Sequence, residues 1–502
     1  MAKICLCLTG RTLARDLEIL EKYRKYVDMA ELRVDCLAPD ERFLIRHFPE
    51  MAGVPVILTV RRSIDGGSYV GGEGSRINIL ANGLAFAEAD RRRNFAYVDL
   101  EEDLDVPSLE EAARTFGTRI IRSWHNPDGV DDNLAEKLTR MRRVGDEIVK
   151  ASLKPASLLD VIRVYQAARD TPGIEKILFC LGEYGTSTGI LAELFDSRIS
   201  YATPPEEADS ALAAPDRPDP KELAELYRFR EISGRTKIFA IAGFPLKASG
   251  SLHFFNTVFG IEQTDAVYIP VPSDSAANLI SYADAIGISG ISVTAPYKEE
   301  ILPFLKYKSN EVIAIGACNT IAAGNGGWTG YNTDAAGFSG SLLAFAGWKD
   351  LRRKRATIIG AGGAARAVAA EVSRLKGKAL ILNRTPGRAR SLASLYRFSW
   401  AGLDSQGANL MERYSDLIIQ ASHSGTEPCA NEDPIELYKF SGRETVMDLN
   451  YSPAKTLFLK RAEDAGCRIL NGSDMLHRQA RHQYAYFMNK EFPPSLVSRV
   501  NF

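Results

Sequence analysis

The sequence lacks the features that would tie it to a membrane or to an extended architecture. No uninterrupted apolar run reaches the roughly 20 residues that a transmembrane helix needs. The apolar run near the start, MAKICLCLTGR, is too short for a signal peptide. The chain also shows no internal repeat and no low-complexity tract. These absences favour a globular protein that has no membrane partner.

The cysteines and the net charge exclude further classes of protein. The seven cysteines form no CxxC pair and no Cys/His cluster, so the usual zinc-binding patterns are absent. Their odd number and scattered positions are typical of a reducing compartment, and we expect a cytoplasmic protein. With 62 basic and 63 acidic residues, the chain has almost no net charge. That balance disfavours nucleic acid as a partner, and we expect small-molecule partners instead.

The most informative stretch runs from Arg355 to Val368, RATIIGAGGAARAV. A β-branched apolar run passes into the pattern Gly360-x-Gly362-x-x-Ala365 and then into an alanine-rich segment. This order predicts a strand, a tight turn and a helix N-terminus, which together bind the pyrophosphate of a dinucleotide. The residues expected to contact the cofactor in this turn are Gly360, Ala361, Gly362, Gly363 and Ala364.

The next expected strand, Ala379–Leu382, determines which dinucleotide is favoured. It ends in Asn383-Arg384-Thr385, and Arg388 follows shortly after. An acidic residue at this place favours the free ribose of NAD, whereas arginine favours the 2′-phosphate of NADP. The sequence therefore predicts NADP as the cofactor, bound by Asn383, Arg384, Thr385 and Arg388.

The first part of the chain alternates short apolar strands with amphipathic helical stretches. A chain of 502 residues is long enough for two or three domains. Strand–helix alternation implies parallel strands, and eight units in roughly 210 residues have the size of a small (β/α)₈ barrel. The expected strands are Ile4–Leu8, Ala30–Val34, Val54–Val60, Ala96–Leu100, Ile120–Trp124, Glu147–Ala151, Ile177–Leu181 and Ile199–Ala202.

Charged residues gather at the carboxyl ends of these strands, where such barrels have their active sites. Lys150 lies within an apolar strand, and desolvation there would make its amine a nucleophile toward ketones. His125, at the end of the preceding strand, can move protons near neutral pH. Each residue alone has a structural explanation, such as a surface ion pair, but their convergence on one barrel face favours an active site. The other strand-end residues are Glu31, Arg33, Asp35, Arg61, Asp99 and Glu101.

These residues resemble the type I 3-dehydroquinate dehydratases over residues 1 to about 230. The motifs that carry the resemblance are Glu31-Leu-Arg33-Val-Asp35, Thr59-x-Arg61, Asp99-x-Glu101, Ser123-Trp-His125 and Val149-Lys150. The resemblance implies that Lys150 forms an imine with the C3 ketone of 3-dehydroquinate. It implies that His125 removes a C2 proton and assists loss of the C1 hydroxyl. Glu31, Arg33 and Arg61 would bind substrate, and Glu101 would support the site.

The barrel sequence departs from this family in three places. Asp65 stands where the family has glutamate before two glycines. Gly189 stands where the family has the arginine that holds the substrate carboxylate, and Arg198 and Arg217 are candidates to replace it. The family's Ser-Ala-Pro-Gly-Gln lid reads Ala213-Ala-Pro-Asp-Arg217 here. The residues for imine chemistry are therefore present, while the contacts to the substrate carboxylate are changed.

A second series of motifs spans residues 236 to 502 and includes the dinucleotide turn. In chain order the motifs are Ser249-x-Ser251, Thr294-x-Pro-x-Lys298, Asn319-Thr320, Asn332-Thr-Asp334, Gly360-Ala-Gly-Gly-Ala, Asn383-Arg-Thr385 and Gly472-Ser-x-Met475-x-x-x-Gln479-Ala480. In this order they resemble the shikimate dehydrogenases. The resemblance implies reduction of 3-dehydroshikimate to shikimate with NADPH.

The same resemblance implies roles for individual residues. Lys298 and Asp334 would hold the reacting hydroxyl and exchange its proton, as hydride transfer to a ketone requires. Ser249 and Ser251 would bind the shikimate carboxylate. Thr294, Asn319 and Gln479 would bind ring hydroxyls, and Tyr451 would lie near the carboxylate and the nicotinamide. Ala248, Leu252 and the stretch Gln420-Ala-Ser422-His423 depart from the family pattern, so the choice between shikimate and quinate stays open.

We therefore expect an α/β protein with an N-terminal (β/α)₈ barrel, a two-lobed α/β substrate domain and a Rossmann NADP-binding domain. The expected ranges are 1–233, 236–335 with a C-terminal helix at 476–502, and 336–475. The favoured function is bifunctional, with dehydration of 3-dehydroquinate followed by reduction to shikimate, in a monomer or homodimer. One alternative is a quinate or shikimate dehydrogenase fused to an inactive barrel, which Gly189 and Ala213 favour. The other is a non-enzymatic regulator that senses metabolites, which the presence of both catalytic sets disfavours.

Overall fold

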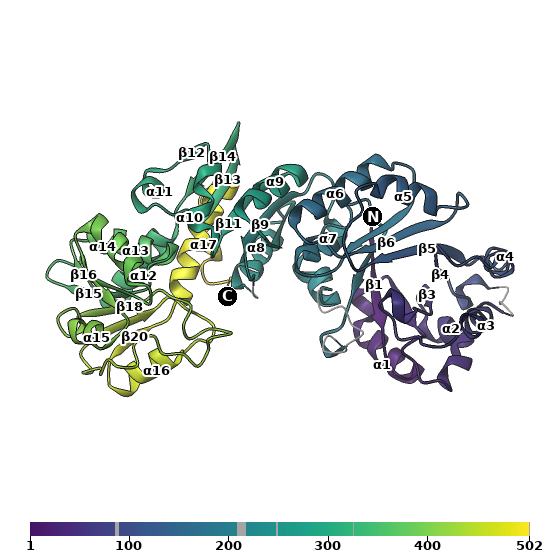
Figure 1. The fold of residues 1–502 in the computed structure, drawn as a ribbon, viewed down its shortest axis with the longest axis horizontal. Coiled ribbons are helices and arrows are strands. Elements are labelled where there is room, and N and C mark those ends of the chain that lie inside the picture. Colours follow the sequence, from purple (N-terminus) through teal and green to yellow (C-terminus); the bar gives the residue numbers. More distant parts are fainter. Residues whose placement is uncertain (86–89, 208–216, 247–248, 325, 501–502) are drawn as a thin grey trace. The chain divides into compact units, whose positions relative to one another are not determined.

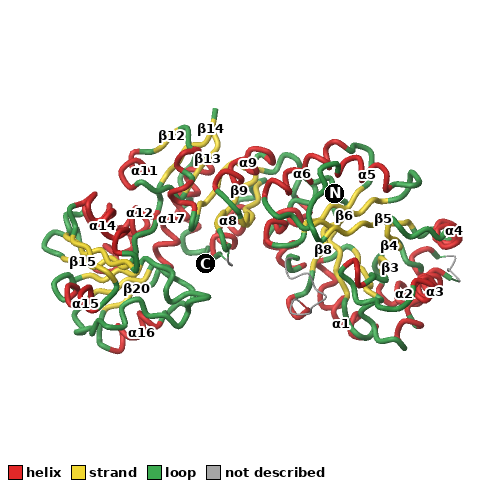
Figure 2. Tube along the Cα trace, in the orientation of Figure 1, coloured by secondary structure: helices red, strands yellow, loops and turns green. Residues whose placement is uncertain are grey.

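The computed structural model describes residues 1–85, 90–207, 217–246, 249–324 and 326–500. The predicted lid residues 213–216, Ala248 and the last two residues of the predicted C-terminal helix lie outside this set. Contacts divide the chain into two compact units, Met1–Ile238 with Phe259–Ile288, and Phe239–Val258 with Ser289–Phe502. Within the described residues, no helix is both long enough and apolar enough to cross a membrane. Figure 1 follows the chain through its three sheets, and Figure 2 marks strands and helices separately.

The N-terminal sheet has eight strands in the order β7-β6-β5-β4-β3-β2-β1-β8. The strands are β1 Lys3–Leu8, β2 Met29–Arg33, β3 Val56–Thr59, β4 Tyr97–Glu101, β5 Arg119–Asn126, β6 Ile148–Leu153, β7 Lys176–Cys180 and β8 Ile199–Ala202. Each neighbouring pair is parallel. A parallel bridge between Lys176 and Ser197 joins β7 to the residues just before β8, so the sheet nearly closes. This confirms the predicted barrel.

Helices follow the strands and cover the outside of this sheet (Figure 1). They are α1 Leu13–Tyr23, α2 Phe48–Ala52, α3 Glu73–Leu84, α4 Pro107–Thr115, α5 Leu134–Met141, α6 Leu158–Asp170 and α7 Thr186–Ile190. Helix α1 begins where it does because the side chain of Thr12 accepts a hydrogen bond from the backbone N–H of Arg15.

The barrel lumen has an apolar floor beneath a polar layer. Successive strand residues point to opposite faces, so every second residue enters the lumen. These residues form a buried cluster of Cys5, Cys7, Met29, Ile57, Ile121, Ile148, Ile177, Ile199 and Tyr201, in which Cys7 is level with Glu31 of the polar layer. Two residues further along five of the strands, the buried side chains are Glu31, Thr59, Asp99, Ser123 and Lys150. The alternation thus places polar side chains toward the carboxyl ends of the strands, next to a layer of buried apolar side chains.

The second sheet has the order β10-β9-β11-β13-β14-β12. Its strands are β9 Lys237–Gly243, β10 Ala266–Pro272, β11 Ile288–Val293, β12 Tyr307–Lys308, β13 Thr320–Gly324 and β14 Gly327–Tyr331. Strand β13 runs antiparallel to both β11 and β14. The helices of this part are α8 Gly250–Ile261, α9 Ala276–Ile286, α10 Tyr297–Glu300, α11 Asn310–Ile315, α12 Asp334–Ala346 and the C-terminal α17 Ser473–Met488, which packs on α12.

The third sheet is parallel throughout, in the order β17-β16-β15-β18-β19-β20. Its strands are β15 Arg355–Ile359, β16 Lys378–Asn383, β17 Ser399–Gly402, β18 Leu417–Gln420, β19 Thr445–Asp448 and β20 Arg468–Leu470. Numbered from β15, this is the 3-2-1-4-5-6 order of dinucleotide-binding folds. The associated helices are α13 Gly363–Arg374, α14 Pro386–Tyr396, α15 Ser405–Met411 and α16 Leu457–Asp464.

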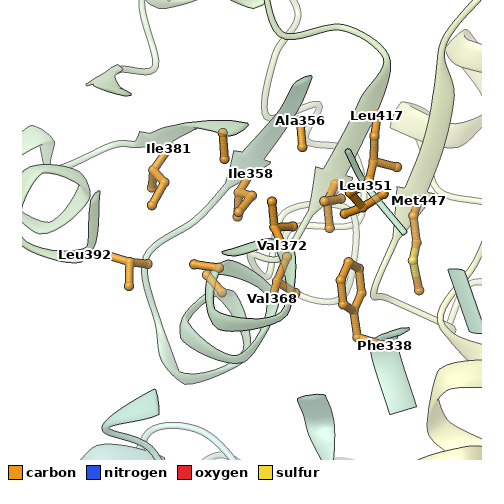
Figure 3. Close-up of a cluster of buried hydrophobic side chains, with 14 of the residues drawn as sticks. Phe338, Leu351, Ala356, Ile358, Val368, Val372, Ile381, Leu392, Leu417 and Met447 are labelled. Carbon is orange, nitrogen blue, oxygen red and sulfur yellow. The ribbon is translucent and has the colours of Figure 1, made fainter. Parts of the chain in front are cut away.

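This sheet is buried on both faces, which explains its nearly continuous apolar strands. On one face, side chains such as Ile358, Ile381 and Leu417 pack against Phe338 and Val368 from the helices (Figure 3). The intervening residues of the same strands form a second buried cluster on the other face. The strand order reverses between β15 and β18, and ligands of such sheets bind at the carboxyl ends beside that point.

Candidate active sites

Lys150 lies at the centre of the first site, inside the barrel. It comes from β6 and is only 4% exposed. Its ammonium Nζ donates to Asp99 Oδ2 at 2.9 Å and to Glu31 Oε1 at 3.3 Å. The same nitrogen lies 4.5 Å from the centre of the Tyr201 ring. Two carboxylates therefore offset the lost hydration of the ammonium and are near enough to accept its proton.

Asp99 links Lys150 to the neighbouring strands. It accepts hydrogen bonds from Arg61 Nη2 at 2.7 Å and from Ser123 Oγ at 2.5 Å. Burial acts to raise the pKa of Asp99, but the positive charges of Arg61 and Lys150 hold it well below its usual range. Arg61 also donates to Glu101 Oε1 at 3.0 Å. Asp99 is therefore charged at neutral pH and fixed in position by three donors.

His125 lies near the end of β5 and is neutral in this setting. Burial is the main cause that lowers the pKa of His125 well below its ordinary value, and the charges of Arg61 and Lys150 lower it further. Its Nε2 atom is buried and has no hydrogen-bond partner among the described residues. A neutral imidazole with a ring nitrogen available can take a proton from a bound molecule.

The two predicted substrate residues of β2 occupy different surroundings. Glu31 accepts from Thr59 Oγ1 at 3.0 Å and contacts Lys150 directly. Burial acts to raise the pKa of Glu31, but the charges of Lys150 and Arg33 bring it to about 2. Arg33 donates two parallel hydrogen bonds to Asp35, at 2.9 and 2.8 Å. The structure thus brings Glu31 to the reactive amine, whereas Arg33 is held by its own acidic partner.

The positions at which the barrel sequence departs from the dehydratase family, and the arginines that could compensate, lie in different parts of the barrel. Asp65 accepts from Arg62 Nε at 2.6 Å, and the described residues give Asp65 no hydrogen bond to His125. Arg198, half exposed, pairs with Glu175 at 3.3 Å. Because residue 198 directly precedes β8 and residue 175 directly precedes β7, this pair lies at the amino end of the barrel, opposite the site.

The strand-end pattern places Asp99 on the active-site face but gives it no role, and the structure makes it the carboxylate nearest to Lys150. Two residues at this site have no predicted role. Ser123 fixes Asp99, and its position two residues before His125 was the available signal. Arg76 is fully buried and donates to Glu101 Oε2 at 2.7 Å. Arg76 comes from α3, and no local pattern connects it with a strand end.

The second site is centred on Lys298 of α10 and Asp334, the first residue of α12. Lys298 Nζ donates to Asp334 Oδ2 at 2.5 Å. Asn319 Nδ2 donates to Asp334 Oδ1 at 2.8 Å, while Asn319 Oδ1 accepts from the backbone N–H of Thr333 at 2.8 Å. The structure thus brings three predicted residues together. An ammonium beside a fixed carboxylate can bind a hydroxyl group and transfer its proton.

Helix α17 contributes two glutamines to the same region. A Cβ at Gly337, one turn into α12, would lie 3.2 Å from the Cβ of Gln479, so the two helices pack closely there. Gln483, which the prediction omits, is buried and donates to Thr320 Oγ1 at 3.1 Å. Residues four apart share a helix face, so the position of Gln483 relative to Gln479 was the available signal.

The predicted strand, turn and helix at the dinucleotide motif are present. Strand β15 ends at Ile359 and α13 begins at Gly363. Gly360 has φ +116°, and a Cβ there would lie 2.9 Å from the carbonyl oxygen of Ala421, so the turn requires glycine. A Cβ at Gly363 would lie 2.8 Å from the Cβ of Lys298. The lysine of the second site therefore lies directly against the dinucleotide turn.

Arg384 and Arg388 are exposed beyond the end of β16. Asn383 Nδ2 donates to the carbonyl oxygen of Thr385 at 3.0 Å, which stabilises the turn that precedes α14. The two guanidinium groups thus stand near the helix start, where an anionic group can bind.

Other predicted residues of the second site are not joined to the Lys298–Asp334 pair. The backbone N–H of Thr294 donates to Ala242 at 2.8 Å, which places the ends of β9 and β11 side by side. Ser249 and Ser251 follow β9, and Ser249 Oγ accepts from the Ser251 backbone N–H at 3.2 Å. Tyr451 is half-buried after β19. Among the described residues, no hydrogen bond links either serine or Tyr451 to the pair.

Comparison with known proteins covers both halves of the chain. The model of the shikimate dehydrogenase substrate-binding domain matches residues 241–321. A shikimate dehydrogenase (NADP(+)) of Moorella thermoacetica is 35% identical over 285 residues, covering 54% of this chain and 94% of the relative. The chain belongs to the shikimate dehydrogenase family. The Lys298–Asp334 pair and the dinucleotide turn lie within this shikimate dehydrogenase half.

The barrel half matches the model of type I 3-dehydroquinase over residues 4–234. The bifunctional 3-dehydroquinate dehydratase/shikimate dehydrogenase of Arabidopsis thaliana is 27% identical over 498 residues, covering 94% of this chain and 79% of the relative. The shikimate biosynthesis protein AroDE of Chlamydia muridarum is 29% identical over 393 residues, with 77% of each chain covered. These matches confirm both resemblances and the predicted fold, in which a dehydroquinase barrel precedes a shikimate dehydrogenase.

Proposed function

We propose that the barrel dehydrates 3-dehydroquinate at Lys150 and that the second site reduces the resulting 3-dehydroshikimate with NADPH at Lys298 and Asp334. The observation that carries this proposal is that each half holds a lysine against a buried carboxylate. The distance is 2.9 Å from Lys150 to Asp99 and 2.5 Å from Lys298 to Asp334. Both lysines lie where their folds place ligands.

The barrel residues support a complete dehydration sequence. Lys150 gives its proton to Asp99 or Glu31, attacks the C3 carbonyl, and the adduct loses water to form an imine. Neutral His125 removes the C2 proton, and the electron pair moves into the imine to give an enamine. The enamine expels the C1 hydroxyl, which leaves as water with the proton from His125. Hydrolysis of the imine restores Lys150, so the net change is the loss of one water.

The second half has the features that NADP requires. The turn at Gly360 has no room for a Cβ, and Gly362 and Gly363 open α13 with backbone N–H groups that have no partner within the helix. Exposed Arg384 and Arg388 suit a 2′-phosphate. When bound, NADPH supplies a hydride to the ketone carbon.

The residues of this chain supply the proton that accompanies reduction. Lys298 donates a proton to the developing alkoxide oxygen, and Asp334 holds the ammonium in place and favours its reprotonation. Asn319 keeps Asp334 oriented through its bond to Oδ1. Ser249, Ser251, Thr294, Gln479 and Tyr451 would bind the carboxylate and hydroxyls of the substrate.

The test uses the purified full chain and separates the two activities. Supplied with 3-dehydroquinate and no nicotinamide cofactor, the protein is expected to produce the ultraviolet absorbance of the conjugated enone in 3-dehydroshikimate. Lys150→Ala should abolish this signal and leave shikimate-dependent NADP reduction unchanged. Lys298→Ala should have the opposite effect, so each variant controls for the other. Enone formation that persists in Lys150→Ala would refute the lysine mechanism.

A second candidate function is a shikimate or quinate dehydrogenase that carries an inactive barrel. The observation that favours it is Gly189, which lies buried in α7 where the family has a carboxylate-binding arginine. An enone signal absent from the unmodified protein, together with normal NADP reduction, would establish this alternative. Comparing quinate with shikimate in the same NADP assay would then identify the preferred substrate of the second site.

A further inference from the structure

Arg217 is a cation of the barrel lumen that forms no direct salt bridge in the described structure, although its charge acts on nearby Glu31. Arg33, Arg61 and Lys150 each form salt bridges with buried carboxylates. Arg217 takes part in none of the salt bridges among the described residues, and its hydrogen bond runs from Nη1 to the thiol of Cys7. Burial raises the pKa of that thiol to about 11, so the thiol is neutral and does not balance the guanidinium.

The guanidinium and the reactive amine both lie near the ring of Tyr201. Its central carbon is 5.2 Å from the centre of the Tyr201 ring and 5.1 Å from that of Phe179. Lys150 Nζ is 4.5 Å from the centre of the same Tyr201 ring. The two cations thus contact one aromatic side chain, and Arg217 lies within reach of a small molecule bound to Lys150.

Four buried polar atoms at this end of the barrel have no hydrogen-bond partner among the described residues. They are Arg217 Nε, Tyr201 Oη, Thr203 Oγ1 and His125 Nε2. Such groups are uncommon in native proteins, and burying them without a partner is unfavourable. A bound molecule with a carboxylate and hydroxyl groups would supply acceptors and donors to all of them.

The backbone around Arg217 is anchored next to Gly189. The Thr203 backbone N–H donates to the carbonyl oxygen of Pro218 at 3.2 Å, which fixes this segment to the end of β8. A Cβ at Gly189 would lie 3.6 Å from Pro218 Cδ, an ordinary contact. A Cβ at residue 189 therefore fits, and it would contact the segment that carries Arg217.

We propose that Arg217 binds the carboxylate of the barrel's substrate and that Tyr201 and Thr203 complete the polar contacts. Arg217 thereby replaces the carboxylate-binding arginine that the family has at the position of Gly189. This inference rests on the proposed dehydratase function. It makes Arg217 a determinant of specificity for anionic over neutral ketones. Arg198 is excluded from this role because it lies at the opposite end of the barrel, paired with Glu175.

The first experiment measures whether the preference of the barrel for a negatively charged substrate depends on residue 217. The full chain and Arg217→Gln are each titrated with 3-dehydroquinate and with its neutral methyl ester. Borohydride traps the imine, and mass spectrometry quantifies the adduct on Lys150. The substitution should raise the half-saturating concentration of the acid at least about tenfold, the size expected for a charge-assisted contact. It should leave that of the ester nearly unchanged, because the ester carries no negative charge.

Rescue and control variants complete the test. Gly189→Arg added to Arg217→Gln should lower the KM for 3-dehydroquinate again, because the new guanidinium starts beside the same segment. Arg198→Gln should leave KM and kcat unchanged. An equal rise in the half-saturating concentrations of acid and ester would show that Arg217 only supports packing. An unchanged half-saturating concentration of the acid would show that Arg217 binds no carboxylate. Either result overturns the inference. Absence of any adduct in the unmodified protein would instead refute the proposed dehydratase function itself.

Discussion

The two halves of this protein place a lysine against an aspartate in contrasting surroundings. Lys150 projects from a β-strand into the lumen of the nearly closed barrel, where both its carboxylate partners are buried. Lys298 projects from a four-residue helix, remains 17% exposed at its side chain, and has Asp334 as its carboxylate partner. The same pair of residue types is thus enclosed in one half and open on one side in the other.

The difference matches the two proposed chemistries. A nucleophile that forms a covalent bond has to be fixed relative to both the substrate and the base, and a strand inside a barrel provides that rigidity. A proton donor for hydride transfer has to lie next to the cofactor. Lys298 meets this need by packing against Gly363 at the start of the dinucleotide helix. The location of a Lys–Asp pair, rather than its presence, therefore determines what it can do.

The largest expected difference concerns matched substitutions of the two aspartates. Asp99→Asn should lower dehydratase kcat about 100-fold or more, since Lys150 and Arg61 lose a shared charged acceptor. It should also lower the free energy of unfolding by about 3 kcal/mol or more, because buried cations are left without their partner. Asp334→Asn should lower dehydrogenase kcat about as much but cost about 1 kcal/mol, because Lys298 can be rehydrated.

Calorimetric unfolding of the full chain, together with both activity assays, would measure these effects. Each variant should leave the activity of the other half unchanged. Equal stability losses in the two variants would contradict the distinction between an enclosed and an open pair.

A smaller effect is expected when two neighbouring glycines of the dinucleotide turn are compared. A Cβ at Gly363 would lie 2.8 Å from Lys298 Cβ and 2.9 Å from its Cδ, so Gly363→Ala should displace the lysine. We expect dehydrogenase kcat to fall about tenfold or more, as catalytic groups are sensitive to small displacements. The added Cβ in Gly362→Ala would meet no atom within 4 Å, so this substitution should mainly raise the KM for NADP, because the proposed pyrophosphate site lies at this turn. Identical kinetic effects of both variants would refute the contact with Lys298 as the cause.

The smallest effect concerns the pH dependence of the barrel. The pKa of His125 lies well below its ordinary 6.5, mainly through burial and further through Arg61 and Lys150. His125 is therefore already deprotonated at pH 6.5 and available as a base. Dehydratase kcat should stay level as the pH falls through 6.5 and decline only at lower pH, when the imidazole gains a proton. A kcat that has fallen by half near pH 6.5 would mean that His125 is hydrated or is not the base.

Local sequence patterns predict the strands of the barrel and the residues that share a strand face. Because side chains alternate along a strand, Asp99 and Glu101 have to face the same side, as do Ser123 and His125. The order of apolar run, glycines and alanine-rich segment likewise predicts the β15–α13 turn. Patterns of this kind depend only on neighbouring residues, so they are visible without the fold.

The partners of these residues were not predictable in the same way. The sequence predicts both Arg33 and Arg61 as substrate-binding residues without distinguishing them. In the structure, Arg33 donates hydrogen bonds to Asp35, whereas Arg61 donates to Asp99 beside Lys150. Arg76 comes from a helix and carries no strand periodicity. Such pairings depend on side-chain geometry between elements, which no local pattern encodes.

The sequence by itself determined the two folds, the types of residue at each site and the cofactor class that the glycine turn can accept. Only the tertiary structure decided that Asp99 is the partner of Lys150, that Gly363 supports Lys298, and that Arg217 enters the lumen beside Tyr201. The physical reason is the range of the interactions. Alternation and turn geometry act between neighbouring residues, whereas charge pairing and close packing join residues that only the nearly closed barrel and the packed sheets bring together.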